Sequence, residues 1–388
     1  MKVGRVSRGR PRTRYRAWVA LVGFVAVLAA GTWGLTGAQP RPGTDAWALS
    51  AVQDARFVAA DPATAPVPVA ESPIRPWCVG AHVASGGAEP AHADGAEPQT
   101  SDASAHDGAI EGDMVLSVWA HPDDDLVFMN PGIADDLQAG ECVSTVFLTG
   151  GDAGAGQDRA TARERGVMAA YDDLMGRETT WHEVRVVLGS GVEASVWTPD
   201  GDDRVSLTFL DLPDGNTGGQ GFAATHHETL PRLLAGDLPE LHPVDGAPAV
   251  TRTALVSALE EIVTLLEPDH VVTSIPEGAP GAVDDPTRPD HPDHRAAGAV
   301  TREALLDVGF DLDRVDFLVG YPSYDLPVNL GGDELVDKVL AFRRYAQYDE
   351  TSYCADYTSC LHHGRLGQWL QRHYVMTEDE LYPAGTPD

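Results

Sequence analysis

The stretch from Val115 to Asp125 constrains the fold more than any other part of the chain. Its first half, Val115 to Ala120, is a short apolar run with β-branched residues, which predicts a buried strand. Pro122 cannot donate a hydrogen bond to a sheet, so the strand must end before it. The turn that follows carries His121 and three consecutive aspartates. Open α/β sheets hold their ligands at the carboxyl ends of the strands, so we expect these polar side chains at that edge.

The composition of this turn favours a metal site. Several carboxylates beside an imidazole are costly to bury unless a cation neutralises them, and His nitrogen with Asp oxygen suits zinc. The alternative is an acidic helix N-terminus, because Asp is favoured at N-caps.

A second motif far downstream favours the metal interpretation. Residues 290–294 read Asp-His-Pro-Asp-His, and Pro292 at a first helical position would place His291 and His294 on one face of a helix start. Carboxylates commonly orient metal-bound imidazoles from behind, which makes a mere polar loop the weaker alternative.

The two motifs together resemble those of the PIG-L/LmbE-like family of zinc-dependent N-deacetylases. The resemblance covers roughly residues 112 to 375. It is supported by three shorter matches, which are Thr149 to Gly154, Arg163-Glu164 and Leu212 to Gly215. The fold that it implies is a Rossmann-like three-layer α/β/α sandwich. The alternation of predicted strands and helices also indicates a mainly parallel sheet covered on both faces.

The predicted elements are short strands separated by amphipathic helices. We expect strands at 115–120, 142–148, 184–188, 205–210, 270–273 and 315–319. We expect helices at 131–139, 161–174, 228–234, 253–266, 294–307, 334–345 and 365–374.

The resemblance also implies a Zn²⁺ site. Its ligands would be His121, Asp124 and His294, which leave the open position that marks a catalytic zinc. Asp123 would be the general base, and zinc with His291 would stabilise the oxyanion.

Further roles follow from the resemblance for three more residues. Asp293 would orient His291. Arg163 and Asp214 would contact a sugar hydroxyl, although Arg163 read without the resemblance is equally consistent with a helix-surface charge.

The sequence departs from the family pattern at two positions. Asp125 replaces the usual Glu, and Pro289 stands where some relatives carry a carbonyl-polarising Tyr. The histidine pairs 226–227 and 362–363 lack a matching set of acids like those of the two motifs, so we expect them to be surface residues.

The charge excludes some partners. The 388 residues carry a formal net charge of −32, although the first 38 contain seven basic residues and no acid. The strongly negative charge of the chain after residue 38 argues against nucleic-acid binding and against adsorption to anionic lipid.

The N-terminal part is expected to direct export. Residues 17–35 are nearly all apolar and uncharged and follow the basic segment, as in an export signal. Cleavage near residues 36–38 would give a secreted protein. We favour an uncleaved anchor, because the run approaches the ~20 residues that span a bilayer. We therefore divide the chain into a membrane anchor or signal peptide (1–38), a flexible spacer rich in Ala, Pro, Gly and Asp (39–110) and a deacetylase domain (111–388), with an extracytoplasmic location.

Export would also permit disulfides. Cys354 and Cys360 flank a short polar loop and are the expected pair. Cys78 with Cys142 is one of the pairings that remain open.

The function expected from these features is hydrolysis of an N-acetyl group from an amino sugar or glycoconjugate. One alternative is an amidase on a non-sugar N-acyl compound. Another, from a different class, is an inactive glycan-binding module, against which the intact motifs argue. The sequence specifies neither the substrate nor the oligomeric state.

Overall fold

The computed structural model describes residues 55–69, 74, 112–283 and 287–384. The chain divides into two units, Met1–Gly43 and Thr44–Asp388, and the first of these lies outside the described residues. The expected anchor at 17–35 therefore lies outside the described residues as well. Within the described part, no helix is long and apolar enough to cross a membrane.

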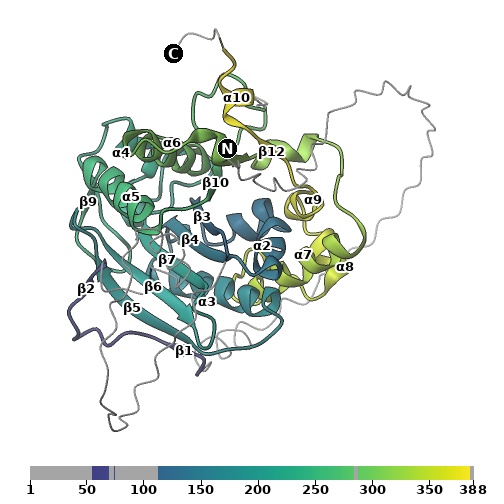
Figure 1. The fold of residues 1–388 in the computed structure, drawn as a ribbon, viewed down its shortest axis with the longest axis horizontal. Coiled ribbons are helices and arrows are strands. Elements are labelled where there is room, and N and C mark those ends of the chain that lie inside the picture. Colours follow the sequence, from purple (N-terminus) through teal and green to yellow (C-terminus); the bar gives the residue numbers. More distant parts are fainter. Residues whose placement is uncertain (1–54, 70–73, 75–111, 284–286, 385–388) are drawn as a thin grey trace, which may run out of the picture. The chain divides into compact units, whose positions relative to one another are not determined.

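A ten-stranded, mostly parallel sheet forms the centre of the domain (Figure 1). In spatial order its main path is β1 (Phe57–Val58), β5 (Trp181–Val187), β6 (Glu193–Pro199), β7 (Val205–Leu212), β4 (Cys142–Thr149), β3 (Met114–Trp119), β10 (His270–Ser274), β11 (Val315–Leu318) and β12 (Val375–Met376). β2 (Val67–Pro68) also pairs with β5, and β8 (Glu240–Leu241) pairs with β9 (Val250–Thr251) in a separate ribbon. The ladders of the main sheet are parallel except β5–β6, β6–β7 and β11–β12.

Helices cover both faces of the sheet (Figure 1). One face packs α4 (Leu230–Leu234), α5 (Arg252–Leu266) and α6 (Pro292–Asp307). The other packs the short π-helix η4 (Asp125–Met129), α2 (Gly132–Ala139), α3 (Gln157–Leu174), α7 (Gly332–Tyr345), α8 (Tyr357–Leu361) and α9 (Leu366–Leu370). α10 (Glu378–Leu381) ends the described chain beside the first face. The fold is the expected LmbE-like α/β/α arrangement.

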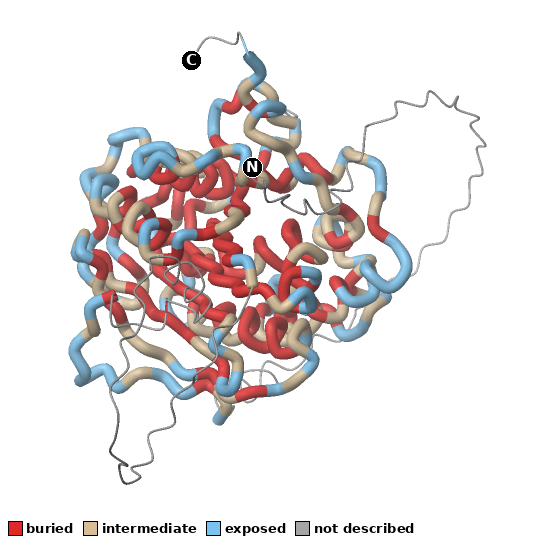
Figure 2. Tube along the Cα trace, in the orientation of Figure 1, coloured by how far each residue is buried: buried red, intermediate tan, exposed pale blue. Residues whose placement is uncertain are grey.

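Strand β3 explains why the sheet is buried on both sides. Leu116 and Val118 belong to the core under α5 and α6, whereas Val115 and Trp119 belong to the core under α3 and α7. Side chains alternate between faces along a strand, so a continuous apolar run is what a doubly covered strand requires. All six residues of β3 are buried, as the central red strands of Figure 2 show.

The predicted spacer is wrong in part. Phe57 and Val58 form β1 and pair in parallel with β5, and Val67 and Pro68 also pair with β5. Ile74 is fully buried. These few apolar residues are enough to extend an exposed sheet edge, because the pairing uses backbone groups and needs little side-chain signal. The rest of the spacer lies outside the described residues.

The expected Cys354–Cys360 disulfide is present. Cys142 is disulfide-bonded too, and its suggested partner, Cys78, lies outside the described residues. Replacing both Cys354 and Cys360 by Ser should lower the free energy of unfolding by about 2 kcal/mol, because the closed loop is short. Urea unfolding of the oxidised protein and of the double variant measures this, and equal midpoints would contradict it.

A buried pair of acids, Glu164 on α3 and Asp211 at the end of β7, should make stability fall as pH rises. Burial, reinforced by the charge of Asp245, raises the pKa of Asp211 to about 7, and burial raises the pKa of Glu164. The folded state then holds protons that the unfolded chain has released above about pH 4. Stability due to this pair is therefore complete below about pH 4 and is lost as pH rises toward 7.

Asp211→Asn tests this, because the amide cannot ionise. We expect the variant to lose less stability than the parent between pH 5 and pH 8, by up to about 1.4 kcal/mol for each pH unit crossed below the raised pKa. Urea unfolding at several pH values measures it. A pH slope equal to that of the parent protein would refute the assignment.

Candidate active site

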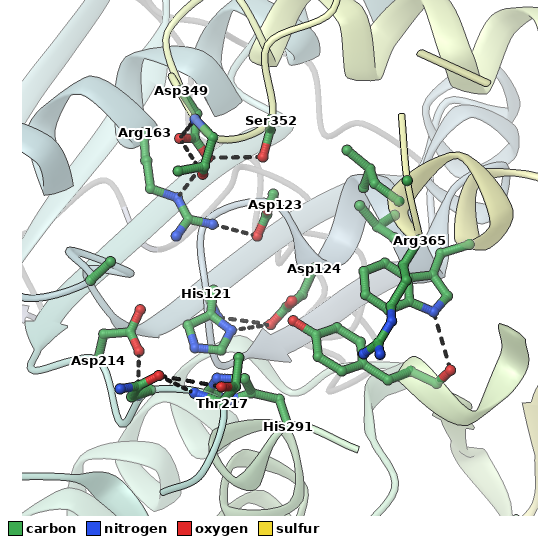
Figure 3. Close-up of a pocket in the computed structure, with 18 of the residues that line it drawn as sticks. His121, Asp123, Asp124, Arg163, Asp214, Thr217, His291, Asp349, Ser352 and Arg365 are labelled. Atoms are coloured by element: carbon green, nitrogen blue, oxygen red, sulfur yellow. Dashed lines mark hydrogen bonds and ion pairs between the residues drawn. The ribbon is translucent and has the colours of Figure 1, made fainter. Parts of the chain in front are cut away.

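The site lies where several chain segments meet at the carboxyl edge of the sheet. His121 follows β3, Asp214 follows β7, and Tyr321 follows β11 at the start of the 3₁₀ helix η7 (Tyr321–Asp325). His291 is the N-cap of α6, and Pro292 is its first residue, as predicted. His121, Asp214, His291 and Tyr321 line a pocket of about 430 Å³ (Figure 3). Its position agrees with the rule for ligands in open α/β sheets.

The structure brings His121, Asp124 and His294 together. His294 Nε2 lies 3.0 Å from Asp124 Oδ1, and His121 Nδ1 lies 3.4 Å from Asp124 Oδ2. Donor atoms of a tetrahedral zinc site stand about 3.3 Å apart, given metal–ligand distances near 2.0–2.1 Å. His294 Nε2 is buried and makes no hydrogen bond, although Asp124 is so close. His294 Nε2 and Asp124 Oδ1 thus lie close together without forming a hydrogen bond. This arrangement is expected of two ligands that point at the same cation.

The electrostatics of these three residues also fit a cation. Burial opposes charge on Asp124, but His294 and His121 lower the pKa of Asp124 well below its usual range. Burial likewise opposes protonation of His294, yet Asp124 and Asp290 raise its pKa to about 9. The buried carboxylates of Asp124 and Asp290 are stabilised by nearby positive charge, which either the protonated imidazoles or a divalent metal supplies.

A wider set of donors surrounds this centre. Within the described residues, the ring nitrogens of His121, His291 and His294 lie within 4.8 Å of one another, and so do ligand atoms of a second set, His121, Asp214, His291 and Asp293. His291 is thus a competing ligand to Asp124, and whether a His291→Ala variant keeps its metal discriminates between the two.

Two buried acids orient the imidazoles. Asp290 Oδ1 lies 2.8 Å from His294 Nδ1, which fixes the ring so that Nε2 faces the site. Asp293 behaves differently from its expected role. Its carboxylate accepts a 2.7 Å hydrogen bond from the Gly215 amide and lies 3.3 Å from His121 Nε2, but 3.8 Å from His291 Nδ1. The Gly215 bond draws the carboxylate toward His121.

His291 is held instead by backbone. The Asp293 amide donates to His291 Nδ1 at 3.2 Å, so Nδ1 carries no proton and Nε2 does. Burial, together with the charge of His121, lowers the pKa of His291 to about 4. His291 is therefore a neutral imidazole, and it is one of the residues that line the pocket.

Arg163 and Asp123 form a direct ion pair. Arg163 Nη2 donates to Asp123 Oδ1 at 2.6 Å (Figure 3). Burial, supported by the nearby Asp124, raises the pKa of Asp123, while Arg163 opposes that rise. Among the described residues, none donates a hydrogen bond to the other oxygen, Oδ2. Asp214, the second residue expected to contact substrate, lines the pocket and accepts a 2.7 Å hydrogen bond from the Asn216 amide.

Sequence reasoning missed the wall of the pocket that the C-terminal part provides. Tyr321 stacks on Trp369 with ring centroids 4.1 Å apart, and its ring lies 4.9 Å from that of His294. The other lining residues of this wall are Asp349, Thr351, Ser352, His363, Gly364, Arg365 and Leu366. Of these residues, only Tyr321 could have been predicted from the sequence, because it closely follows the strand predicted at 315–319. His226, His227 and His362 are exposed as expected, but His363 lines the pocket.

The fold and this site define an α/β protein with a buried His/Asp centre at the sheet edge. The GlcNAc-PI de-N-acetylase (PIG-L) family model matches residues 116–305, just under half of the chain. No curated protein matches the chain.

Several solved structures resemble the fold at low identity. N,N'-diacetylchitobiose deacetylase from Pyrococcus horikoshii is 16% identical, with 62% of this chain and 72% of that chain covered and a TM-score of 0.33. The zinc-inhibited form of teicoplanin deacetylase Orf2 is 16% identical, with 64% and 89% covered and a TM-score of 0.35. GalB, the 4-carboxy-2-hydroxymuconate hydratase from Pseudomonas putida KT2440, is 15% identical, with 61% and 83% covered and a TM-score of 0.32.

Proposed function

We propose that the protein is a zinc-dependent N-deacetylase that hydrolyses the acetamido group of an amino sugar or glycoconjugate. The observation that carries this proposal is that His121, Asp123 and Asp124 line one pocket and that His294 Nε2 lies 3.0 Å from Asp124 Oδ1. The match to the PIG-L family model supports the deacetylase class.

The three ligands would hold one divalent cation. When bound, such an ion makes water acidic and polarises a carbonyl. The His/Asp donor set suits zinc.

The chain's own residues would carry the proton transfers. Asp123 Oδ2 accepts a proton from water as the water oxygen bonds to the acetyl carbon. The neutral His291 then donates a hydrogen bond from Nε2–H to the oxyanion that develops and keeps its proton. Asp123 returns the proton to the amine nitrogen as the C–N bond breaks, so the products are the amine and acetic acid, which ionises to acetate as its proton passes to the amine.

The pocket composition supports a sugar-like substrate. It combines hydrogen-bonding side chains, including Asp214 and Thr217, with the aromatic pair of Tyr321 and Trp369. Tyr321 also lines the pocket. Its phenol is a candidate for the carbonyl-polarising role of the Tyr that is absent at Pro289. We further propose that the domain works outside the cytoplasm, on the strength of the N-terminal segment of the sequence.

Release of acetate from a panel of N-acetyl compounds tests the proposal. The panel should contain N-acetylated amino sugars, their glycoconjugates and non-sugar N-acyl amines, each assayed with zinc-loaded protein. Release from the sugars is the expected result. Release from the non-sugar amines alone would make the protein an amidase, and binding of sugars without release would make it a glycan-binding module.

A further inference from the structure

Arg163 is held in a single orientation by three acceptors. It is 7% exposed, and its guanidinium donates from Nη2 to Asp123 Oδ1 at 2.6 Å, from Nη1 to the Gly151 carbonyl at 2.7 Å and from Nε to the Tyr345 hydroxyl at 2.7 Å. Each nitrogen therefore has a partner. A guanidinium fixed in this way points one N–H at Asp123 and leaves little freedom for a separate role.

Tyr345 and Asp349 form the next link of the chain of hydrogen bonds. Tyr345 is fully buried and donates its hydroxyl proton to Asp349 Oδ2 at 3.1 Å, so the lone pairs of the hydroxyl face Arg163. Asp349 is fixed in turn by Arg159 Nη2 and the Ser352 hydroxyl, each at 3.0 Å. In Figure 3, Asp349 and Ser352 lie above the Arg163 guanidinium, on the side away from His121.

Two glycines make room for this arrangement. Gly151 has φ +55°, and a Cβ there would collide with the Arg163 guanidinium. A Cβ on Gly166 of α3 would lie 2.8 Å from Cδ2 of Tyr345 on α7. Neither contact tolerates a side chain without movement, so the backbone is shaped around the two side chains.

We propose that Tyr345 and Asp349 are positioning residues that hold Arg163 and, through it, the Asp123 carboxylate in its reactive orientation. Because Oδ1 of Asp123 is occupied by Arg163, Oδ2 is the oxygen presented to water. The inference rests on the proposed role of Asp123 as the base. Both positioning residues lie beyond residues 116–305, so a part of the chain outside the family model completes the site.

Tyr345→Phe tests the link most cleanly, because it removes one hydroxyl and keeps the ring. We expect kcat to fall by about 10- to 100-fold, the scale that a small misplacement of a catalytic group produces. KM should stay within about twofold of the parent value, since the lost interaction serves the chemical step. Bound metal should be unchanged. Tyr374→Phe is the matched control, because its hydroxyl donates to the Pro327 carbonyl outside the pocket.

A second variant perturbs the same link without removing a polar group. Gly166→Ala should push the Tyr345 ring away and lower kcat in the same manner. It keeps the proposal testable if Tyr345→Phe fails to fold. Unchanged kcat in a folded Tyr345→Phe, or a raised KM with normal kcat, would overturn the proposal, the latter because Arg163 would then act only on substrate binding.

A crystal structure of Tyr345→Phe separates this inference from the proposed function. Absence of acetate release by the parent protein would defeat the function alone. A guanidinium displaced from Asp123 in the variant would support the link whatever the activity, whereas an unchanged 2.6 Å contact between Arg163 and Asp123 would overturn it.

Discussion

Asp123→Asn is expected to reduce turnover by about 10²–10⁴-fold while the protein keeps its metal, because the amide cannot accept the proton of the attacking water. The amide oxygen still accepts a hydrogen bond from Arg163, so the geometry of the ion pair is largely preserved. The loss should therefore lie in kcat, with KM little changed. Acetate release and elemental analysis of the same purified sample measure both quantities.

Asp124→Asn is the matched control, since it makes the same change one residue along the chain. It weakens an anionic ligand, so we expect metal affinity itself to fall. If both acids only capped a helix, each change would cost at most about 1 kcal/mol of stability and activity would survive. Near-normal turnover by Asp123→Asn would remove Asp123 from the mechanism.

His294→Ala is expected to lose the metal. Changing a residue behind a ligand already costs about 10–100-fold in affinity, so loss of a ligand should cost more than about 10²-fold. Elemental analysis after dialysis against a buffered low concentration of free zinc measures occupancy.

His291→Ala is the companion variant, because His291 is the competing ligand in the His121, His291 and His294 set. We expect it to retain metal and lose turnover, as the loss of an oxyanion donor would do. Metal loss in His291→Ala would make His291 a ligand in place of Asp124, and full occupancy in His294→Ala would contradict the assignment of His294 as a ligand.

The central part of the fold was predictable because its signals are local. The apolar run before His121 is typical of a buried strand, and Pro292 marked the start of α6. By contrast, β6 was missed, since its polar and aromatic residues resemble a loop until they pair with β5 and β7. The helix predicted at 365–374 is only the short α9.

The histidine and aspartate motifs were predictable as a site because clustered carboxylates and imidazoles are costly to bury without a cation. Their individual partners were not. Which carboxylate reaches which imidazole depends on backbone contacts such as the Gly215 amide, which draws Asp293 toward His121. Tyr345 and Asp349 carry no motif of their own, and only the packing of α7 against α3 brings them to Arg163.

The most direct test of the central claim is the titration of metal-free protein with zinc while acetate release is followed. Protein stripped with a chelator should be inactive on an N-acetylated amino sugar that the untreated protein hydrolyses. Activity should rise linearly with added zinc and level off at one equivalent per chain, because His121, Asp124 and His294 form one site. Full turnover by the metal-free protein would contradict the claim.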